Sequence, residues 1–361
     1  MTARHVVEVD PLADGRWDRF VLAQRAACGH HLAAWAEILR DCYGFKPRYL
    51  ALEDAGALVG VLPLVHSGRR LSGPRLSSLP TSKSAGPLGL DIEGERELLR
   101  CAGEIGHREP ASALTVRSEH ADLEGGPIGL GGTDRTYRLP PREEAELLDG
   151  YRRGAKNLYR SIRKAEKAGL AISDTRSGAE LRDWYRLYLA TIRRHRNFPR
   201  RLRQFQASMS LLQGVWRLVV VKKNGRVIAG GVFHDIGETV ELVYNASDSA
   251  YLSERPNHAL YWRVLRDAAQ RGQGFDFGLA ASESLRSFKE QWGAEPVPIY
   301  LYAHREDSPH AGDSAALADD TGSAGARRPA GAAARSLGTA ALSRLPLAVN
   351  RLAGALAYRL A

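Results

Sequence analysis

The sequence lacks long apolar runs, and it contains little cysteine. No apolar stretch approaches the ~18 residues that a membrane-spanning helix requires, and the N-terminal segment MTARHVVEVDPLADGRW has no apolar signal core. The 3 cysteines, Cys28, Cys42 and Cys101, share no metal-ligand spacing, and their grouping in the first third of the chain is not typical of a disulfide framework. These absences predict a globular protein of the cytosol that uses neither disulfides nor a bound metal.

Positive charge is what the sequence has in excess, and the excess is clustered. The net charge is +10, and residues 151–169 hold 7 lysines and arginines against one acid, Glu166. Residues 193–203 add 6 arginines and no acid. Clustered charge of one sign attracts phosphates, and the alternative is a solvated helix face. The predicted phosphate-binding or nucleic-acid-binding surface consists of Lys156, Arg160, Arg163, Lys164 and Lys167.

Hydrophobic periodicity predicts an α/β chain of mixed α+β type. Apolar residues from Tyr151 to Ala165 recur every three or four residues, which indicates one amphipathic helix over 151–169. The segment WRLVVVKKNGRVIAGGVFH indicates a hairpin with an Asn-Gly turn at 224–225. In the first half, LALEDAGALVGVLPLVH has the same layout with its turn at 55–56. We therefore expect two copies of one mixed α/β unit.

Composition divides the chain into four parts. We expect two domains, at 1–150 and 151–305, each with a mixed, mostly antiparallel sheet flanked by helices. Residues 306–340 are rich in Ala, Gly, Ser, Asp and Arg, which predicts a disordered linker. Residues 341–361 repeat leucine and valine at helical spacing with arginines between, which predicts an amphipathic helix. This helix either packs on the body of the protein or contacts a membrane surface.

A lysine among aromatic residues is the main polar feature of the second half. SFKEQWGAEP at 287–296 places Lys289 next to Phe288 and ahead of Trp292. A stem in apolar surroundings with its ammonium at a cleft suits a group that meets a phosphate or an oxyanion; a surface lysine lying over the tryptophan is the alternative. Glu241 lies in an otherwise apolar or aromatic strand, so it is either on a solvated face or a buried base with a raised pKa. Three histidines are further candidates for acid–base chemistry: His195, His234 and His258.

The sequence disfavours a coenzyme A cradle. RGQG at 271–274 looks like the phosphate loop of acetyl-coenzyme A enzymes, but it follows a predicted helix and leads into a strand. Such a loop must lie between a strand and a helix N-terminus, where backbone N–H groups point at the diphosphate. The segment in that position, DSAYLSERPNHALYW, has no glycine, and Pro256 has no N–H.

Six motifs follow one another over residues 151–303: RSIRKAEKAGL, the Asn-Gly hairpin, VYNASD, PNHALYWRVLRDAAQRG, FDFG and FKEQWGAEP. In this order they resemble the Fem-type peptidoglycan-bridge aminoacyltransferases, and most closely the bacterial FemAB-like proteins with a GNAT-type acyltransferase domain. The resemblance implies tandem GNAT-like domains. It also implies acyl transfer to an amine of a cell-envelope precursor or small molecule, with aminoacyl-tRNA as the expected donor.

The resemblance also implies roles for individual residues. Phe288 and Lys289 border the acyl-donor site, and Thr191 with Arg193 hold acceptor phosphates. We expect Lys289 to supply positive charge to the oxyanion or a donor phosphate, and Glu241 to take the amine proton. The expected substrate-binding residues are Phe288, Trp292, Tyr244, Asn257, Thr191 and Arg193. In the first domain, His30 and His31 stand where the family pattern has a lysine, and the chain lacks the long helical-hairpin insertion with which some bridge enzymes hold tRNA.

Several alternatives stay open at this point. No permanently bound cofactor is expected, and the donor is either aminoacyl-tRNA or an acyl-coenzyme A. The partners implied are an amine-bearing acceptor, tRNA and, through the C-terminal helix, a membrane surface. An acyl-coenzyme A-dependent acetyltransferase and a non-catalytic basic protein that binds nucleic acid or anionic membrane are the competing functions. The expected place is the cytoplasm, with peripheral contact at the inner membrane face as the variant.

Overall fold

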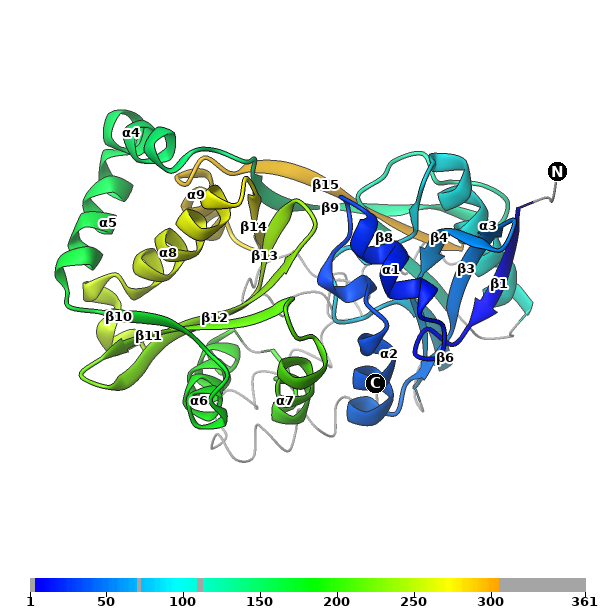
Figure 1. Cartoon of the computed structure of the whole chain (residues 1–361), viewed down its shortest axis with the longest axis horizontal. Coiled ribbons are helices and arrows are strands. Elements are labelled where there is room, and N and C mark those ends of the chain that lie inside the picture. Colours follow the sequence, from blue (N-terminus) through cyan, green and yellow to red (C-terminus); the bar gives the residue numbers. More distant parts are fainter. Residues whose placement is uncertain (1–3, 70–72, 109–112, 196, 305–361) are drawn as a thin grey trace, which may run out of the picture. The chain divides into compact units, whose positions relative to one another are not determined.

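The computed structural model of the chain describes residues 4–69, 73–108, 113–195 and 197–304 (Figure 1). The predicted linker at 306–340 and the predicted amphipathic helix at 341–361 lie outside these residues. Among the described helices, none has both the length and the apolar character needed to cross a lipid bilayer.

The chain divides into two compact units. The first comprises the chain up to Arg135 together with the strand residues from Val297 onward, and the second comprises Thr136–Pro296. The division falls before the expected border at 150 because strand β9 (Ile128–Leu139) crosses it: from Thr136 onward, β9 pairs with β14 (Gly274–Leu279) of the second unit.

The described part of the first unit combines a four-stranded antiparallel sheet, ordered β1-β3-β4-β7, with strands ordered β15-β8-β6-β5-β2. Its strands are β1 (His5–Val9), β2 (Lys46–Pro47), β3 (Tyr49–Asp54), β4 (Ala57–Leu62), β5 (Leu64–Arg69), β6 (Gly73–Ser78), β7 (Leu88–Gly89), β8 (Ala113–Ser118) and the end of β15 (Glu295–His304). Its helices are α1 (Arg16–Ala23), the 3-10 turn η1 (Gly29–His31), α2 (Ala34–Tyr43) and α3 (Ile92–Arg108). Leu98 and Leu99 of α3 pack on Leu52 and Leu62 in one buried core.

The second unit contains strands in the order β10-β11-β12-β13-β14-β9, with helices on both sides. Its further strands are β10 (Ala171–Thr175), β11 (Trp216–Lys223), β12 (Arg226–Ile236) and β13 (Thr239–Ser247). Its helices are α4 (Glu144–Gly154), α5 (Lys156–Lys167), α6 (Gly178–Arg194), α7 (Leu202–Leu211), the 3-10 turn η2 (Ser249–Glu254), α8 (Pro256–Gln270) and α9 (Glu283–Glu290). Figure 1 shows α8 and α9 on one side of β11–β13 and α6 and α7 on the other. Both units are thus mixed, mostly antiparallel sheets flanked by helices, as predicted.

Both predicted hairpins are present, and they share a turn geometry. Asn224 and Gly225 have φ of 50° and 79°, and Ala55 and Gly56 have 49° and 82°. Positive φ at both central residues defines the type I′ turn, whose twist matches that of the flanking strands. The predicted duplication therefore holds at the level of local backbone structure.

The helix predicted over 151–169 is broken in the middle. α4 starts at Glu144 and ends at Gly154, and α5 starts at Lys156, because Ala155 has non-helical φ and ψ of −119° and 58°. Tyr151 holds α4 by donating a hydrogen bond of 2.9 Å to the Trp292 carbonyl. The apolar stripe is real, but it spans two helices that meet at a kink.

Candidate functional site

Strands β13 and β14 of the second unit separate after a short paired stretch. They run parallel and pair from Thr239 with Gly274 to Glu241 with Asp276. Beyond this point β13 continues to Ser247 and β14 to Leu279, and their described register contains no further pair between them. Backbone N–H and C=O groups need partners when they are buried. The separated edges therefore offer polar groups to a bound ligand.

A β-bulge in β13 decides which residues share a face of the sheet. Val232 pairs with Tyr244 and Phe233 with Leu242, so Val243 is the extra residue between the two pairs. Side chains normally alternate between the two faces of a strand. The extra residue shifts this alternation by one, so residues an odd number of positions apart across the bulge share a face.

Tyr244 and Glu241 consequently point to the same side. The Tyr244 ring centre lies 5.7 Å from Tyr188 of α6 and 5.1 Å from Phe205 of α7. Leu242 belongs instead to the core that contains the buried face of α8. Glu241, which alternates with Leu242, therefore faces the α6–α7 side together with Tyr244.

Glu241 is buried, with 7% of the residue exposed, so the alternative of a solvated face is wrong. Its cross-strand partner is His234, which is also buried. The distance from His234 Nδ1 to Glu241 Oε2 is 3.9 Å. The position fits the predicted proton acceptor, and that role stays a prediction.

Lys289 is buried, with 6% of the residue exposed, so the alternative of a surface lysine lying over the tryptophan is wrong. Nζ donates a hydrogen bond of 2.8 Å to the Gly278 carbonyl and a second one to the Leu279 carbonyl. It also lies 5.8 Å from the centre of the Tyr137 ring. At least two of the three ammonium donors thus hold the end of β14, and the predicted role toward an oxyanion or phosphate stays untested.

The same strand end is held by a buried carboxylate, Asp276. Its Oδ1 accepts hydrogen bonds from the Thr136 hydroxyl at 2.5 Å and the Gly278 N–H at 2.7 Å, and its Oδ2 accepts from Arg138 at 3.1 Å. Gly278 has φ of 75°, a conformation that favours glycine. Sequence analysis did not single out Asp276. The signal was an acid inside the apolar run FDFG, because a buried acid requires partners.

Phe288 and Trp292 pack together as predicted, in an aromatic cluster between α8 and α9. Their ring centres are 6.3 Å apart, and His258 lies 5.5 Å from Phe288 and 6.0 Å from Trp292. Burial lowers the pKa of His258 to about 4, with a smaller contribution from Arg255. His258 is therefore a neutral imidazole at neutral pH.

The remaining predicted substrate residues fall into two groups. Thr191 is buried near the end of α6, one turn after Tyr188, and its hydroxyl accepts from Arg194 at 3.2 Å. Arg193 on the same helix is half-buried. Asn257 lies at the start of α8 and donates to the Ser247 hydroxyl at 3.3 Å. Glu241, Tyr244 and Thr191 thus come from elements on the α6–α7 side, whereas Asn257, Phe288 and Lys289 come from α8 and α9.

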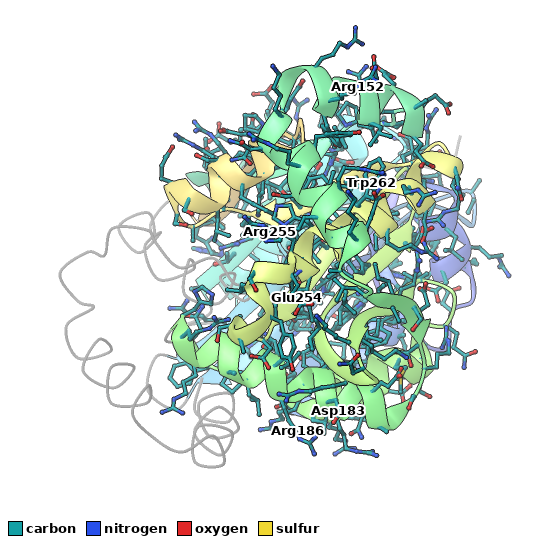
Figure 2. The ribbon with its side chains drawn as sticks, turned by 90° about the vertical axis from the view of Figure 1, so that its left-hand side faces the viewer. Arg152, Asp183, Arg186, Glu254, Arg255 and Trp262 are labelled. Atoms are coloured by element: carbon teal, nitrogen blue, oxygen red, sulfur yellow. The ribbon has the colours of Figure 1, made fainter. Side chains whose placement is uncertain are left out.

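The five cations of the predicted phosphate surface are all exposed on α5. The opposite face of the helix, formed by Leu158, Ile162 and Ala165, is buried. Figure 2 views the molecule from the side that carries α4 and α5, with Arg152 of α4 labelled. The predicted separation of charged and apolar faces is confirmed; the partner of the charged face stays a prediction.

The turn before α8 has the features that disfavour a coenzyme A diphosphate. Arg255, labelled in Figure 2, has φ of 61°, and its carbonyl accepts from the N–H groups of His258 and Ala259 at 3.0 and 3.1 Å. Pro256 has no N–H. Asp248 uses its carboxylate to cap the turn, accepting from the Ala250 N–H at 3.0 Å. Few donors remain for a diphosphate, and an acid stands beside them.

In the first unit, His31 is not a cationic counterpart of the expected lysine. Its Nε2 lies 3.1 Å from the Gly86 carbonyl, so Nε2 carries the proton and Nδ1 accepts from the Cys28 N–H at 3.0 Å. Burial lowers the pKa of His31 to about 4. His30 stacks on Trp35 with ring centres 4.5 Å apart. A neutral imidazole has no positive charge with which to attract a phosphate, as a lysine does.

Comparisons with known proteins agree with this architecture. Residues 152–290 match the family model described as acetyltransferase (GNAT) domain. Among solved structures, FemX superposes with a TM-score of 0.65 at 17% identity, over 83% of this chain and 96% of that one. The C-terminal domain of a putative lysylphosphatidylglycerol synthetase from Agrobacterium fabrum gives 0.58 at 13% identity, over 84% and 95%.

A third structure, L-PGS from Bacillus licheniformis, has a TM-score of 0.56 at 13% identity, over 88% of this chain and 98% of that one. No curated protein sequence matches the chain at a significant level. At these identities the structural likeness concerns the fold. Residues 152–290 thus match a GNAT domain, and over 83% of the chain the fold is similar to that of FemX.

Proposed function

We propose that the protein is an N-acyltransferase of the FemAB/GNAT type. It transfers an aminoacyl or acyl group to an amine of a cell-envelope precursor or small molecule, and aminoacyl-tRNA is the donor. The observation that carries this proposal is the separation of β13 and β14 after Glu241 and Asp276. Beyond Glu241, the edge of β13 has no paired partner among the described residues of β14, so its N–H groups are the proposed hydrogen-bond donors to an acyl carbonyl.

The predicted acid–base group lies at the start of this opening. Glu241 is the last β13 residue paired with β14, and it faces the α6–α7 side. Donor residues on α8 and α9, such as Phe288, belong to the other side. An acyl group bound in the opening would therefore meet an amine that approaches from the side of Glu241.

The chemistry follows from this arrangement. The neutral amine attacks the acyl carbonyl, so a C–N bond forms and the ester C–O bond of the donor breaks. Glu241 takes the proton that the amine loses, directly or through water, and passes the same proton to the departing ribose oxygen, so the carboxylate is regenerated. Backbone N–H groups on the edge of β13 beyond Glu241 are the candidates for stabilising the oxyanion, since the Gly278 N–H of β14 already donates to Asp276.

The choice of aminoacyl-tRNA as the donor rests on the backbone of the turn before α8. Its N–H groups are absent at Pro256 or occupied at His258 and Ala259, which disfavours the coenzyme A diphosphate. The structural relative named as a putative lysylphosphatidylglycerol synthetase supports an aminoacyl donor. An acyl-coenzyme A donor is the competing proposal, and the family model's acetyltransferase description favours it.

Mass spectrometry of products tests the proposal. The protein is offered charged tRNA or acetyl-coenzyme A together with a panel of amines. We expect a new amide from charged tRNA, and E241Q should lower kcat/KM by roughly 10²–10⁴, the usual contribution of a general base. The exposed Glu238, in the turn between β12 and β13, provides the matched control, E238Q. Transfer by E241Q at the wild-type rate would remove Glu241 from the mechanism.

A further inference from the structure

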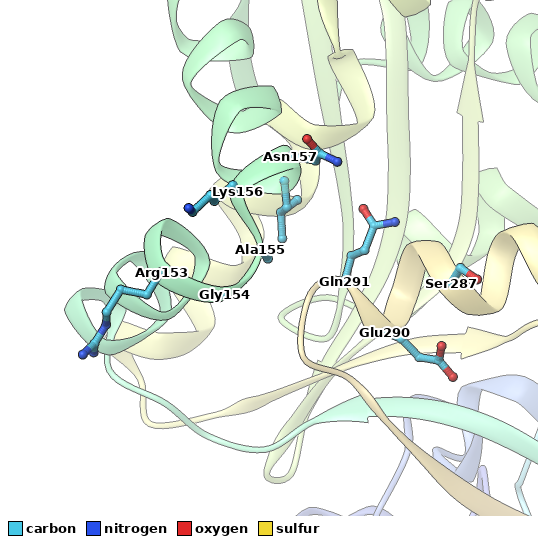
Figure 3. A pocket seen from close by; sticks show the side chains of 9 residues that line it. Arg153, Gly154, Ala155, Lys156, Asn157, Ser287, Glu290 and Gln291 are labelled. Carbon is cyan, nitrogen blue, oxygen red and sulfur yellow. The ribbon is translucent and has the colours of Figure 1, made fainter.

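A cavity of about 690 Å³ lies where the kink between α4 and α5 faces α9 (Figure 3). A volume of this size is in the range of small-molecule sites. The residues that line it come from two segments: Arg153, Gly154, Ala155, Lys156, Asn157 and Leu158 on one wall, and Ser287, Glu290 and Gln291 on the other. The second wall belongs to the same helix as Phe288 and Lys289, the residues expected to border the acyl donor, which lie between Ser287 and Glu290 in α9.

The walls carry amide and hydroxyl groups and one carboxylate, and the cations lie at the rim. Figure 3 shows Asn157 and Gln291 on facing walls, whereas Arg153 and Lys156 extend outward from the kink. The Asn157 side-chain oxygen accepts from Arg160 at 2.5 Å, which leaves its NH₂ group as a donor. Glu290 contributes a carboxylate, an acceptor for hydroxyl groups, whose Oε1 lies 3.6 Å from Arg286 Nε. Such a lining suits a ribose better than a bare phosphate.

A stripe of cations continues from the rim along α5. Lys156 and Lys167 are eleven residues apart, so the stripe is roughly 17 Å long at 1.5 Å per residue. Within the described residues, Lys156, Lys164 and Lys167 form no ion pair, and Arg163 pairs with Glu166 at 2.5 Å. Unpaired lysines in a row attract a chain of phosphates.

The same helix is unsuited to a lipid surface. An interfacial helix binds membrane by burying its apolar face among lipid. The apolar face of α5 is already buried against the core that contains α8. Among the described residues, the exposed large hydrophobic side chains do not include any on α4, α5 or α9. Charge complementarity therefore selects a soluble polyanion.

We propose that the cavity and the α5 stripe dock the RNA of the acyl donor, which rests on the function proposed above. A ribose lies in the cavity against Asn157, Gln291 and Glu290, and the neighbouring phosphates lie along α5. None of the lining residues is aromatic, so bases are not stacked there. The surface consequently reads the RNA backbone without base preference, and it prefers RNA to DNA because Glu290 accepts from a 2′-hydroxyl.

Fluorescence anisotropy with uncharged tRNA tests the docking surface independently of catalysis. K156E/K164E should raise Kd about tenfold or more and reduce the slope of log K against log salt by about 1.5, since each phosphate contact contributes roughly 0.7–0.9. The matched control is R182E/R186E, two exposed arginines on α6. Equal weakening by the two double variants, or no weakening by the first, would overturn the proposal.

Competition by DNA and binding to lipid vesicles show whether the surface prefers RNA to other polyanions. A DNA strand of the same sequence should compete less well than RNA, and E290A, which removes the acceptor, should reduce that difference. Equal competition by DNA overturns the ribose contact. Vesicles of phosphatidylglycerol should bind wild type and K156E/K164E alike; loss of vesicle binding with unchanged tRNA binding would assign the stripe to a membrane instead.

Measuring acyl transfer with two donors distinguishes the docking surface from the acyltransferase function on which it rests. Transfer from charged tRNA is compared with transfer from aminoacyl-adenosine, which has the ester but no RNA backbone. K156E/K164E should lose activity with charged tRNA and keep it with aminoacyl-adenosine. Equal loss with both donors overturns the docking surface alone. Absence of transfer by the wild type with either donor counts against the proposed function, while the anisotropy result still decides the docking surface.

Discussion

Two helices of the second unit, α5 and α9, line the same cavity but place their lysines in opposite environments. Lys156 of α5 is exposed, whereas Lys289 of α9 is 6% exposed and donates to the carbonyls of Gly278 and Leu279. Both lysines lie within a few residues of an aromatic side chain in the sequence. An aromatic neighbour in the sequence therefore does not by itself show what a lysine ammonium contacts. That is decided by the element packed against the helix, which for Lys289 is the end of β14.

The largest expected effect tests this difference directly. K289M removes two hydrogen bonds from a charged donor to buried carbonyls, and each such bond contributes about 1.5–3 kcal/mol. We expect the free energy of unfolding to fall by roughly 3–4 kcal/mol in urea denaturation. The matched variant K156M, on an exposed lysine, should change it by less than about 0.5 kcal/mol.

Activity measurements sharpen the same comparison. If Lys289 acts only by holding β14, K289R should recover part of the lost stability and activity together, because arginine retains donors. Recovery of stability without activity would assign the ammonium a direct role toward the acyl donor. Similar stability losses for K289M and K156M would contradict the difference between the two helices.

An intermediate effect is expected from His258, which contacts α9. Burial lowers its pKa to about 4, so the folded state favours the neutral imidazole. Below the unfolded pKa of 6.5 the unfolded chain binds a proton at His258 that the folded protein does not bind. The free energy of unfolding is therefore unaffected above pH 6.5 and falls as the pH drops toward 4. At about 1.4 kcal/mol per pKa unit, we expect a loss of roughly 2–3 kcal/mol.

The measurement is the free energy of unfolding from pH 7 to pH 4 for wild type and H258Q. The difference between the two proteins should shrink or reverse as pH falls, since glutamine does not titrate. A constant difference across this range would show that His258 does not carry the pH dependence.

The smallest effects concern two glycines beside these helices. Gly278 has φ of 75°, so G278A should lower the free energy of unfolding by about 1–2 kcal/mol. Gly154 ends α4 with open space around its Cβ position, so G154A should raise it by about 0.5–1 kcal/mol. Thermal or urea denaturation checks both, and a stabilising G278A would contradict the strained strand end.

Much of the fold could be predicted from local patterns. The hairpin turns follow from Asn224-Gly225 and Ala55-Gly56, because few residues adopt positive φ. The apolar stripe through Leu158 and Ile162 predicted the buried side of α5. The kink at Ala155 directly follows Gly154, but one glycine inside an apolar stripe of helical spacing did not predict that the helix would break there.

The candidate site was predicted in part. The packing of Phe288 on Trp292 follows from their helical spacing of four residues. The shared face of Glu241 and Tyr244 could not be predicted, because uninterrupted alternation places them on opposite sides, and one extra residue, Val243, reverses this. The carboxylate of Asp276 was hidden in an apolar run, and its partners Thr136 and Arg138 are distant in sequence.

By itself, the sequence determined the turns, the amphipathic faces and the clustering of positive charge, since these depend on residues within a few positions of one another. Tertiary structure alone decided that β13 separates from β14, that Lys289 is bound to backbone carbonyls, and that the kink before Lys156 faces α9 across a cavity. These features depend on which distant segments become neighbours. Register, bulges and burial set those neighbours, and no local pattern encodes them.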